Sequence, residues 1–297
     1  MARAHLTERL AETEEAMTAL SCRTDDACAL LNPGARRYEP LKRPPDSEIS
    51  ALALLRQLRG VESERSFVRE CERFSSHPFP GVVGYSPPSF HRRARKLRRF
   101  FEPPRRAAPG ELAGDPETLI ADSTLPPVLH PGQVGQSASG FEGAAWTRWG
   151  SLCVCGVKPR LICSTNRVPP SCELTPANTA DVLPTEELLA VADLDESGVV
   201  RRLLGDLACK SDALGRRLTE QDIPLAAEGA SRRPAVRQQV EVCFARLKRV
   251  FGLGETLAAT LVGLAIRIAA QVTAHTCGLY VNRVLGRPQG RIKELRA

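Results

Sequence analysis

The stretch from Arg237 to Gly252 most constrains the fold, because its apolar and charged residues follow two separate helical stripes. It predicts a helix of about four turns that begins soon after Pro234 and ends at Gly252. At roughly 100° per residue, Arg237, Glu241 and Lys248 fall within about 40° of one another. The adjacent apolar stripe, which we expect to face a core, consists of Val236, Val240, Cys243, Phe244, Leu247, Val250 and Phe251. A carboxylate between two cations thus borders the apolar stripe. The same pattern also fits an ordinary ion pair on a solvated helix edge.

Length and charge limit the class of protein. The 297 residues, 42% of them hydrophobic, can bury a sizeable core, and we expect two domains. A formal charge of +7 favours a polyanionic partner, although charge alone identifies none. Met1–Thr24 lacks the apolar segment of a secretory signal, and the longest apolar run, Leu257–Ile266, is too short to span a bilayer. We therefore predict a soluble cytoplasmic protein with no membrane partner, whose cysteines are reduced and packed.

The first part of the chain has the pattern of a helical region. We expect a helix and a linker in 1–45 and a helical domain in 46–110, which a proline- and glycine-rich boundary at Pro103–Gly114 separates from the rest of the chain. Within the helical domain, Asp46 is the predicted N-cap of one helix, which ends at Gly60. Ser86 and the two prolines after it are typical of a helix start.

A run of basic residues covers most of the helix that we expect over Phe90–Phe101. Its members are Arg92, Arg93, Arg95, Lys96, Arg98 and Arg99. A charge run is usually a solvated face, but such a face normally mixes signs, and here Glu102 is the sole acid. The run therefore predicts contact with the DNA backbone. Together with the helices expected over Ile49–Leu58 and Glu62–Phe74, this helix allows a helix-turn-helix, without fixing which helix would enter a groove.

The pattern changes after the boundary. We expect strands at 118–122, 152–157, 161–163, 173–175, 199–205 and 223–226, and helices at 184–192 and 211–221. The strands at 152–157 and 161–163 are predicted to be the two arms of a hairpin. Strands first in a meander and then alternating with helices predict a mixed α/β sheet covered by helices in 111–254. A long helix is expected in the last segment, 255–297.

Three acids stand in comparable places in this domain. Asp122 and Asp206 each end an apolar strand, and Glu241 lies at a helix edge. Carboxylates that converge repel one another, so such a cluster makes sense mainly as a site for divalent cations, and oxygen ligands favour Mg²⁺ or Mn²⁺. Two such ions can activate a water or a 3′-hydroxyl in phosphodiester chemistry. Each acid alone also fits an ordinary strand-end cap or surface position.

The sequence resembles the DDE transposases of bacterial insertion sequences, from about Asp46 to Arg283. The motifs that carry the resemblance are Ile120-Ala-Asp122-Ser123, Glu173-Leu-Thr-Pro-Ala-Asn178-Thr-Ala-Asp181, Leu204-Gly-Asp206 and Arg237-(x3)-Glu241-(x6)-Lys248. The resemblance implies an RNase H-like catalytic domain behind an all-helical DNA-binding unit. It also implies cleavage of DNA at the element ends, followed by attack of the freed 3′-hydroxyl on target DNA.

The same resemblance implies roles for individual residues. Asp122, Asp206 and Glu241 are implied to be the catalytic triad that binds two Mg²⁺ or Mn²⁺ ions. The residues implied to contact DNA phosphates near the cleaved bond are Arg237 and Lys248, and Lys158 is a further expected DNA-binding residue. The expected partner is DNA, both element ends and target, and the expected location is the cytoplasm, in association with the nucleoid. The oligomeric state stays open, with a homodimer on the DNA as one option.

The chain departs from this family at three places. Pro234 and Cys209 stand where relatives commonly have aromatic residues. Pro159 and Arg160 replace an aliphatic residue and a histidine, and Pro159 is expected to remove a ladder hydrogen bond next to the site. Two alternatives therefore stay open: a catalytically impaired, transposase-derived DNA-binding protein, and a stand-alone RNase H-like nuclease.

Overall fold

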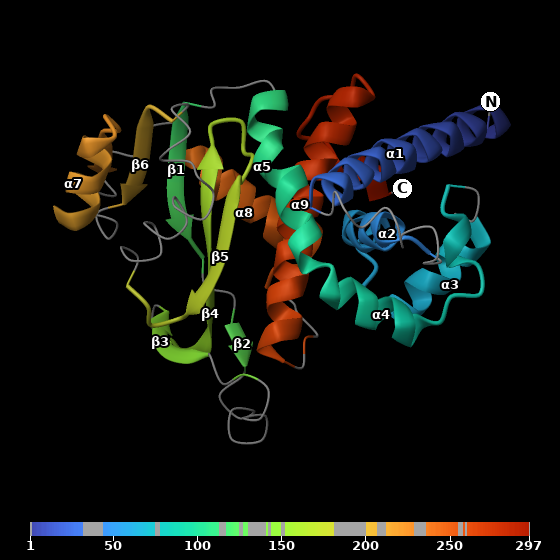
Figure 1. Ribbon diagram of the computed structural model, residues 1–297, viewed down its shortest axis with the longest axis horizontal. Helices are drawn as coiled ribbons and strands as arrows, with labels where there is room; N and C mark the ends of the chain where they lie inside the picture. The colour runs from blue at the N-terminus through green and yellow to red at the C-terminus, as the bar shows by residue number, and fades with distance from the viewer. Residues whose placement is uncertain are drawn as a thin grey trace. The chain divides into compact units, whose positions relative to one another are not determined.

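The computed structural model divides the chain into two compact units (Figure 1). One unit comprises Met1–Pro104 and Ala269–Ala297, and the other comprises Arg105–Ile268. This division groups the last residues with the first ones, whereas the sequence-based expectation gave 255–297 a segment of its own. The structure describes residues 2–31, 44–74, 78–112, 117–124, 127–129, 141, 144–149, 152–180, 200–206, 212–228, 236–254, 258 and 260–296.

The first unit is helical wherever the structure describes regular elements in it. Its helices are α1 (Ala2–Leu31), α2 (Asp46–Arg59), α3 (Glu64–Phe74), α4 (Pro87–Lys96) and the later part of α9 (Leu261–Val284), with the short 3₁₀ helices η3 (Pro80–Val82), η4 (Arg98–Phe101) and η8 (Ile292–Arg296). Ser86 caps α4 by accepting the backbone N–H of Ser89, as the sequence predicts. Across the described helices of the whole chain, none is long and apolar enough to cross a membrane.

Helix α2 is the buried centre of this unit. Every one of its residues except Arg59 is buried, and α2 contacts α1, α4 and η8. Gly60 ends the helix at φ 66°, a conformation that suits glycine, as predicted. The carboxyl-terminal residues close over it: a Cβ on Gly278 of α9 would lie 3.0 Å from side-chain atoms of both Leu58 and Ile292. The absence of a side chain at Gly278 thus permits this close approach.

The expected boundary at Pro103–Gly114 contains the division between the two units, after Pro104, but most of the segment is helical and not a loop. Helix α5 (Glu102–Glu111) runs through it, and the basic helix before it stops at Lys96 instead of continuing to Phe101. Pro103 and Pro104 are the second and third residues of α5. Because N–H groups in the first turn have no acceptor within the helix, prolines are tolerated there. These two prolines therefore belong to the start of a helix and not to a loop.

The second unit is built on a mixed sheet, which confirms the mixed α/β class. Its strands are β1 (Thr118–Ser123), β2 (Pro127–Leu129), β3 (Ala145–Trp149), β4 (Leu152–Ser164), β5 (Ser171–Pro176), β6 (Arg202–Asp206) and β7 (Leu225–Glu228). β4 pairs antiparallel with β5 on one side and with β1 on the other, and β1, β6 and β7 are parallel. β2 and β3 pair with the first part of β4.

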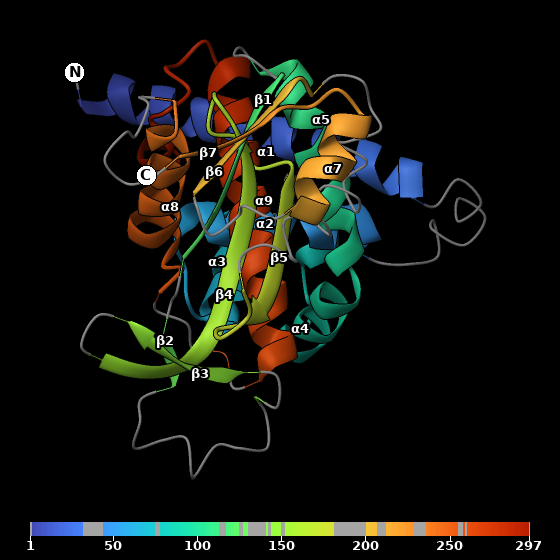
Figure 2. The same ribbon diagram turned by 90° about the vertical axis from the view of Figure 1, so that its left-hand side faces the viewer.

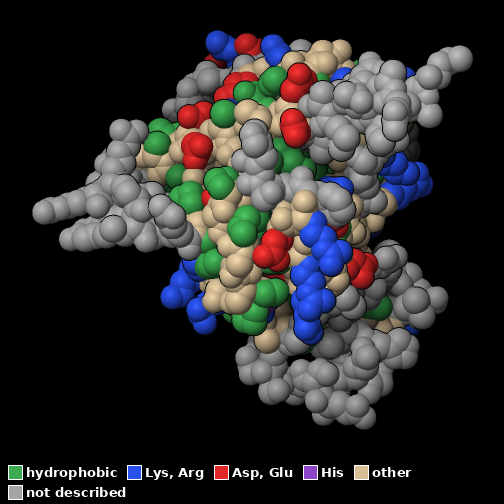
Figure 3. All heavy atoms as spheres, turned by 90° about the vertical axis from the view of Figure 1, so that its right-hand side faces the viewer, with side chains coloured by type: hydrophobic (Ala, Val, Ile, Leu, Met, Phe, Trp, Pro, Cys, Tyr) green, Lys and Arg blue, Asp and Glu red, His purple; other side chains and the backbone are tan. Residues whose placement is uncertain are grey.

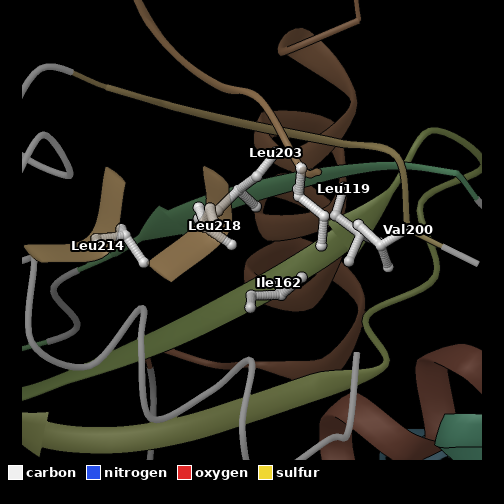
Figure 4. Packing of buried hydrophobic residues seen from close by; sticks show 8 residues of the cluster. Leu119, Ile162, Val200, Leu203, Leu214 and Leu218 are labelled. Atoms are coloured by element: carbon white, nitrogen blue, oxygen red, sulfur yellow. The ribbon is translucent and has the colours of Figure 1, made fainter. Parts of the chain in front are cut away.

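Helices cover both faces of this sheet. Helices α7 (Asp212–Glu220) and α8 (Gln238–Phe251) lie on opposite sides of it (Figure 2). On the α7 face, Leu214 and Leu218 pack against Leu119, Ile162 and Leu203 of the strands (Figure 4). On the other face, α8 contacts β4 and β1 through its buried apolar stripe. Gly252 ends α8 at φ 67°, as predicted.

The expected hairpin at 152–157 and 161–163 is wrong, because β4 is one strand of 13 residues that passes through Pro159. The register that pairs Ser123 with Arg160 puts Thr124 opposite Pro159, and Thr124 donates its backbone N–H to the Pro159 carbonyl at 3.1 Å. N–H and C=O of one residue point to the same side of a strand, so the donor that proline lacks also belongs to the β1 side. Since β1 ends at Ser123, the hydrogen bond that Pro159 cannot donate would be the last one of the β1–β4 ladder.

Some expectations concern residues outside the described ranges. The helix expected at 184–192, the linker residues 32–43, Cys209 and Pro234 all belong to this group. The side chain of Asp206 also lies outside the described part, although its backbone is described.

Candidate functional site

Asp122 and Asp206 occupy equivalent backbone positions on neighbouring strands. β1 and β6 are parallel, and their register pairs Ile120 with Leu204. Each aspartate lies two residues further along its strand. Because parallel strands end at the same edge of a sheet, continuing this register brings the two positions side by side at the carboxyl ends of β1 and β6. The Asp206 backbone is in turn paired with Glu228 of β7.

Asp122 belongs to the sheet face that α8 covers. Leu119, Ala121 and Ile162 join the hydrophobic cluster under α7. Successive side chains of a strand alternate between faces, so Asp122 belongs to the opposite face. Its carboxylate is half-buried and accepts the backbone N–H of Ser123 at 2.8 Å.

The turn between β4 and β5 fixes which side of α8 faces which end of the sheet. Arg167 in this turn donates its Nε to Oε1 of Gln239 at 2.7 Å. The turn comes after Ser164, which pairs with Leu119 at the beginning of β1. The Gln239 side of α8 therefore lies toward the beginning of β1. At roughly 100° per residue, Glu241 is about 200° away from Gln239, which turns it toward the end of β1 where Asp122 lies.

Lys248 supplies independent evidence for this orientation. It is about 180° from Gln239 around the helix, on the same side as Glu241. Burial of the ammonium group lowers the pKa of Lys248, and the negative charge of Asp122 partly offsets this effect. The offset comes from proximity, although the Lys248 side chain as a whole is exposed. Asp122 and the Glu241–Lys248 side of α8 thus belong to one region.

Two other residues that the resemblance implied in DNA binding lie differently. Arg237 precedes α8 and is 7% exposed, so it is buried in the protein. Lys158 pairs with Thr175 of β5 and donates its Nζ to the Thr179 carbonyl at 3.3 Å. Leu161 pairs with Asp122, so their side chains share one face of the sheet. Lys158 is three residues before Leu161 in β4, and successive side chains alternate, so Lys158 belongs to the opposite face. DNA contact by either residue stays a prediction.

Arg160 has a structural role that the sequence reasoning missed. Its side chain is 3% exposed. Its Nε donates to Oγ1 of Thr175 at 2.8 Å, and its Nη2 donates to the carbonyls of Thr179 and Ala180 at 2.7 and 3.2 Å. These bonds order the end of β5 and the turn after it. An arginine inside an apolar strand was the available signal, because buried charge requires partners.

The basic run of the first unit consists of five exposed members and one partly buried member. The exposed members are Arg92, Arg95, Lys96, Arg98 and Arg99, here called the α4 basic surface. Arg93 instead donates to the Pro44 carbonyl at 2.6 Å and forms an ion pair with Asp46 at 2.5 Å. Arg93 therefore holds α4 to the start of α2. On the face that Figure 3 shows, basic side chains lie in separate groups with acidic side chains nearby, so this face does not form one continuous basic patch.

Among the side chains that the structure describes, no group of three or more His, Cys, Asp or Glu is arranged to hold a metal ion. The expected triad is not tested by this finding, because the Asp206 side chain is outside that set. Comparisons with protein-family models, with curated proteins and with solved structures find no match to this chain.

Proposed function

We propose that this chain is a DDE transposase, with an RNase H-like catalytic unit that cuts DNA at element ends and joins the freed 3′ ends to target DNA. The observation that carries the proposal is the equivalent position of Asp122 and Asp206 on neighbouring parallel strands. A strand meander before parallel strands, with α8 packed across β4 and β1, supports an RNase H-like sheet.

The donor set fits hard divalent cations. Asp122, Asp206 and Glu241 offer carboxylate oxygens, which Mg²⁺ and Mn²⁺ prefer. When bound, two such ions activate a water or a 3′-hydroxyl and stabilise the leaving oxygen of a phosphodiester. Lys248, near Asp122 and largely exposed, provides a positive charge at the rim of this region, where it can hold a DNA phosphate.

The α4 basic surface gives the first unit a means to bind DNA. Five exposed cations on α4 and η4 can each neutralise a backbone phosphate, and such contacts position a protein on DNA without reading its sequence. Arg93 is not assigned this role, because its guanidinium already donates to the Pro44 carbonyl and pairs with Asp46.

The test is an assay of cleavage and strand transfer by the full-length chain. The substrate is DNA carrying the sequences that flank its own coding region, incubated with Mg²⁺ or Mn²⁺ and with a target plasmid. We expect nicks at defined ends and joined products. Asp122→Asn and Glu241→Gln should each lower the rate by at least about 10³-fold, the scale on which loss of a catalytic group acts. The matched control is Glu220→Gln, an exposed acid on α7, which should keep full activity.

The other outcomes identify the alternatives. Cutting without joining would indicate a stand-alone nuclease. DNA binding without cutting in either metal would indicate a DNA-binding protein that has lost catalysis. Equal activity in the parent, Asp122→Asn and Glu241→Gln would refute the carboxylate site itself.

A further inference from the structure

A second charged site lies on the side of α8 that is turned away from Glu241. Gln239 and Arg246 are about two helical turns apart and share the same line along α8. Arg167 reaches this line from the β4–β5 turn, where its Nε donates to Gln239 Oε1 at 2.7 Å. The two guanidinium groups therefore face a common region between the turn and the helix.

The two arginines are close enough to repel each other. Burial lowers the pKa of Arg246, and the positive charge of Arg167 lowers it further. Both side chains are half-buried. Within the described part of the chain, no acidic side chain forms an ion pair with either of them. Among the described residues, two like charges are thus held together without an acidic partner.

One further feature is unusual for a surface that only contacts water. Nη1 of Arg246 is buried and has no hydrogen-bond partner among the described residues. Buried N–H donors usually have acceptors. A negatively charged acceptor would both accept a hydrogen bond from Nη1 of Arg246 and offset the repulsion between Arg167 and Arg246.

We propose that Arg167 and Arg246 bind a phosphate group between them. Guanidinium groups present pairs of N–H donors in a fixed plane that match the oxygens of phosphate, and two of them balance a doubly charged anion. The group belongs either to a DNA backbone or to a free phosphate. Because Arg246 lies on another side of α8 from Glu241, this site is independent of the proposed metal chemistry.

The first experiment measures thermal unfolding of the full chain with increasing inorganic phosphate, replacing chloride at constant ionic strength. A ligand that binds the folded state raises the melting temperature, and tighter binding raises it more. We expect a rise for the parent and for Arg216→Gln, which removes the same charge from the exposed face of α7. Arg246→Gln should weaken phosphate binding by at least about tenfold. An equal rise in Arg246→Gln and the parent would mean an adventitious ion only and would overturn the proposal.

The second experiment identifies the source of the phosphate. For duplex DNA, each phosphate contact contributes about 0.9 to the slope of log affinity against log salt. A slope reduced by this amount in Arg246→Gln, and unchanged in Arg216→Gln, assigns a DNA phosphate. An unchanged slope, with the phosphate effect lost, assigns a free phosphate. If neither measurement responds to Arg246→Gln, no phosphate site exists there.

Two variants keep the result interpretable. Arg167→Gln removes the other guanidinium and should reproduce the loss if Arg246→Gln fails to fold. Asp122→Asn should abolish metal-dependent cutting while it leaves the phosphate effect unchanged. Failure of this site and failure of the proposed catalysis are therefore distinguishable.

Discussion

Thr124 donates its backbone N–H to the carbonyl of Pro159 at 3.1 Å, and Pro159 has no N–H with which to return the bond. In an antiparallel ladder the two residues of such a pair normally exchange both bonds. Because β1 ends at Ser123, this half-made pair is the last of its ladder. The proline therefore lies where β4 tolerates it.

Replacement of Pro159 by valine should change the free energy of unfolding by less than about 1 kcal/mol. The restored hydrogen bond contributes about 0.5–1.5 kcal/mol, and loss of proline's restriction of the unfolded chain costs about 0.4–1 kcal/mol. Urea unfolding of the two chains checks this. The contrast is Leu161→Pro, inside the same ladder opposite Asp122, which should destabilise by more than about 2 kcal/mol. A large gain in Pro159→Val would instead show that the proline strains β4.

The Asp122–Lys248 relationship should be measurable as a coupling energy. A double-mutant cycle with Asp122→Asn and Lys248→Gln should give about 0.2–1 kcal/mol of favourable interaction at low salt, since Lys248 is exposed and solvent screens the pair. The coupling should shrink as salt is added. Zero coupling at low salt would contradict the orientation derived for α8.

Neighbouring arginines of α4 should behave differently when replaced. Arg95→Ala should lower the salt dependence of DNA binding by about one contact, about 0.9 in log–log slope, with little change in melting temperature. Arg93→Met should destabilise the protein by up to about 3–5 kcal/mol, because it removes the guanidinium that pairs with the largely buried Asp46 carboxylate. Calorimetry and binding titrations on both variants check the contrast. An unchanged slope in Arg95→Ala would mean that the α4 basic surface is a solvated face.

Glu48 should make the first unit less stable as the pH rises from acid toward neutral. Burial raises the pKa of its carboxyl, and the N–H groups of Gly81 and Val82 offset only part of this effect. Above about 4.5 the unfolded state loses the proton while the folded state keeps it, so stability falls until the folded-state pKa is passed. Glu48→Gln removes this contribution, and its advantage over the parent should grow with pH in urea unfolding. Parallel curves for the two chains would count against it.

Most local signals in the sequence predict local structure well. One exception is the N-cap of α2, which is Pro45, whereas the expected cap Asp46 is the first residue of the helix. The glycines after α2 and α8, the Ser86 cap and the strand ending at Asp206 are all found where their residue types predict them. The failures depend on distant parts of the chain. Pro103 and Pro159 both predict a break from residue type alone, yet the effect of a proline depends on where its missing N–H would have pointed.

The candidate site shows the same limit. Arg93 and Arg95 are indistinguishable members of one basic run, and only the position of Asp46 separates their roles. Except for Val236, which precedes the helix and is exposed, the apolar stripe of α8 is predictable from helical spacing. Which end of the sheet its charged side faces is not, because that depends on the Arg167–Gln239 bond between distant segments.

The composition of the first unit from Met1–Pro104 and Ala269–Ala297 has a consequence during translation. Domains generally fold in the order in which they leave the ribosome. Residues 105–268 can complete their sheet as soon as they emerge, whereas Leu58 must wait for Gly278 and Ile292 before its surroundings are filled. The first unit is thus completed only after residues 105–268 have been made, and the nascent chain carries its α4 basic surface on an unclosed core until Ile292 has emerged.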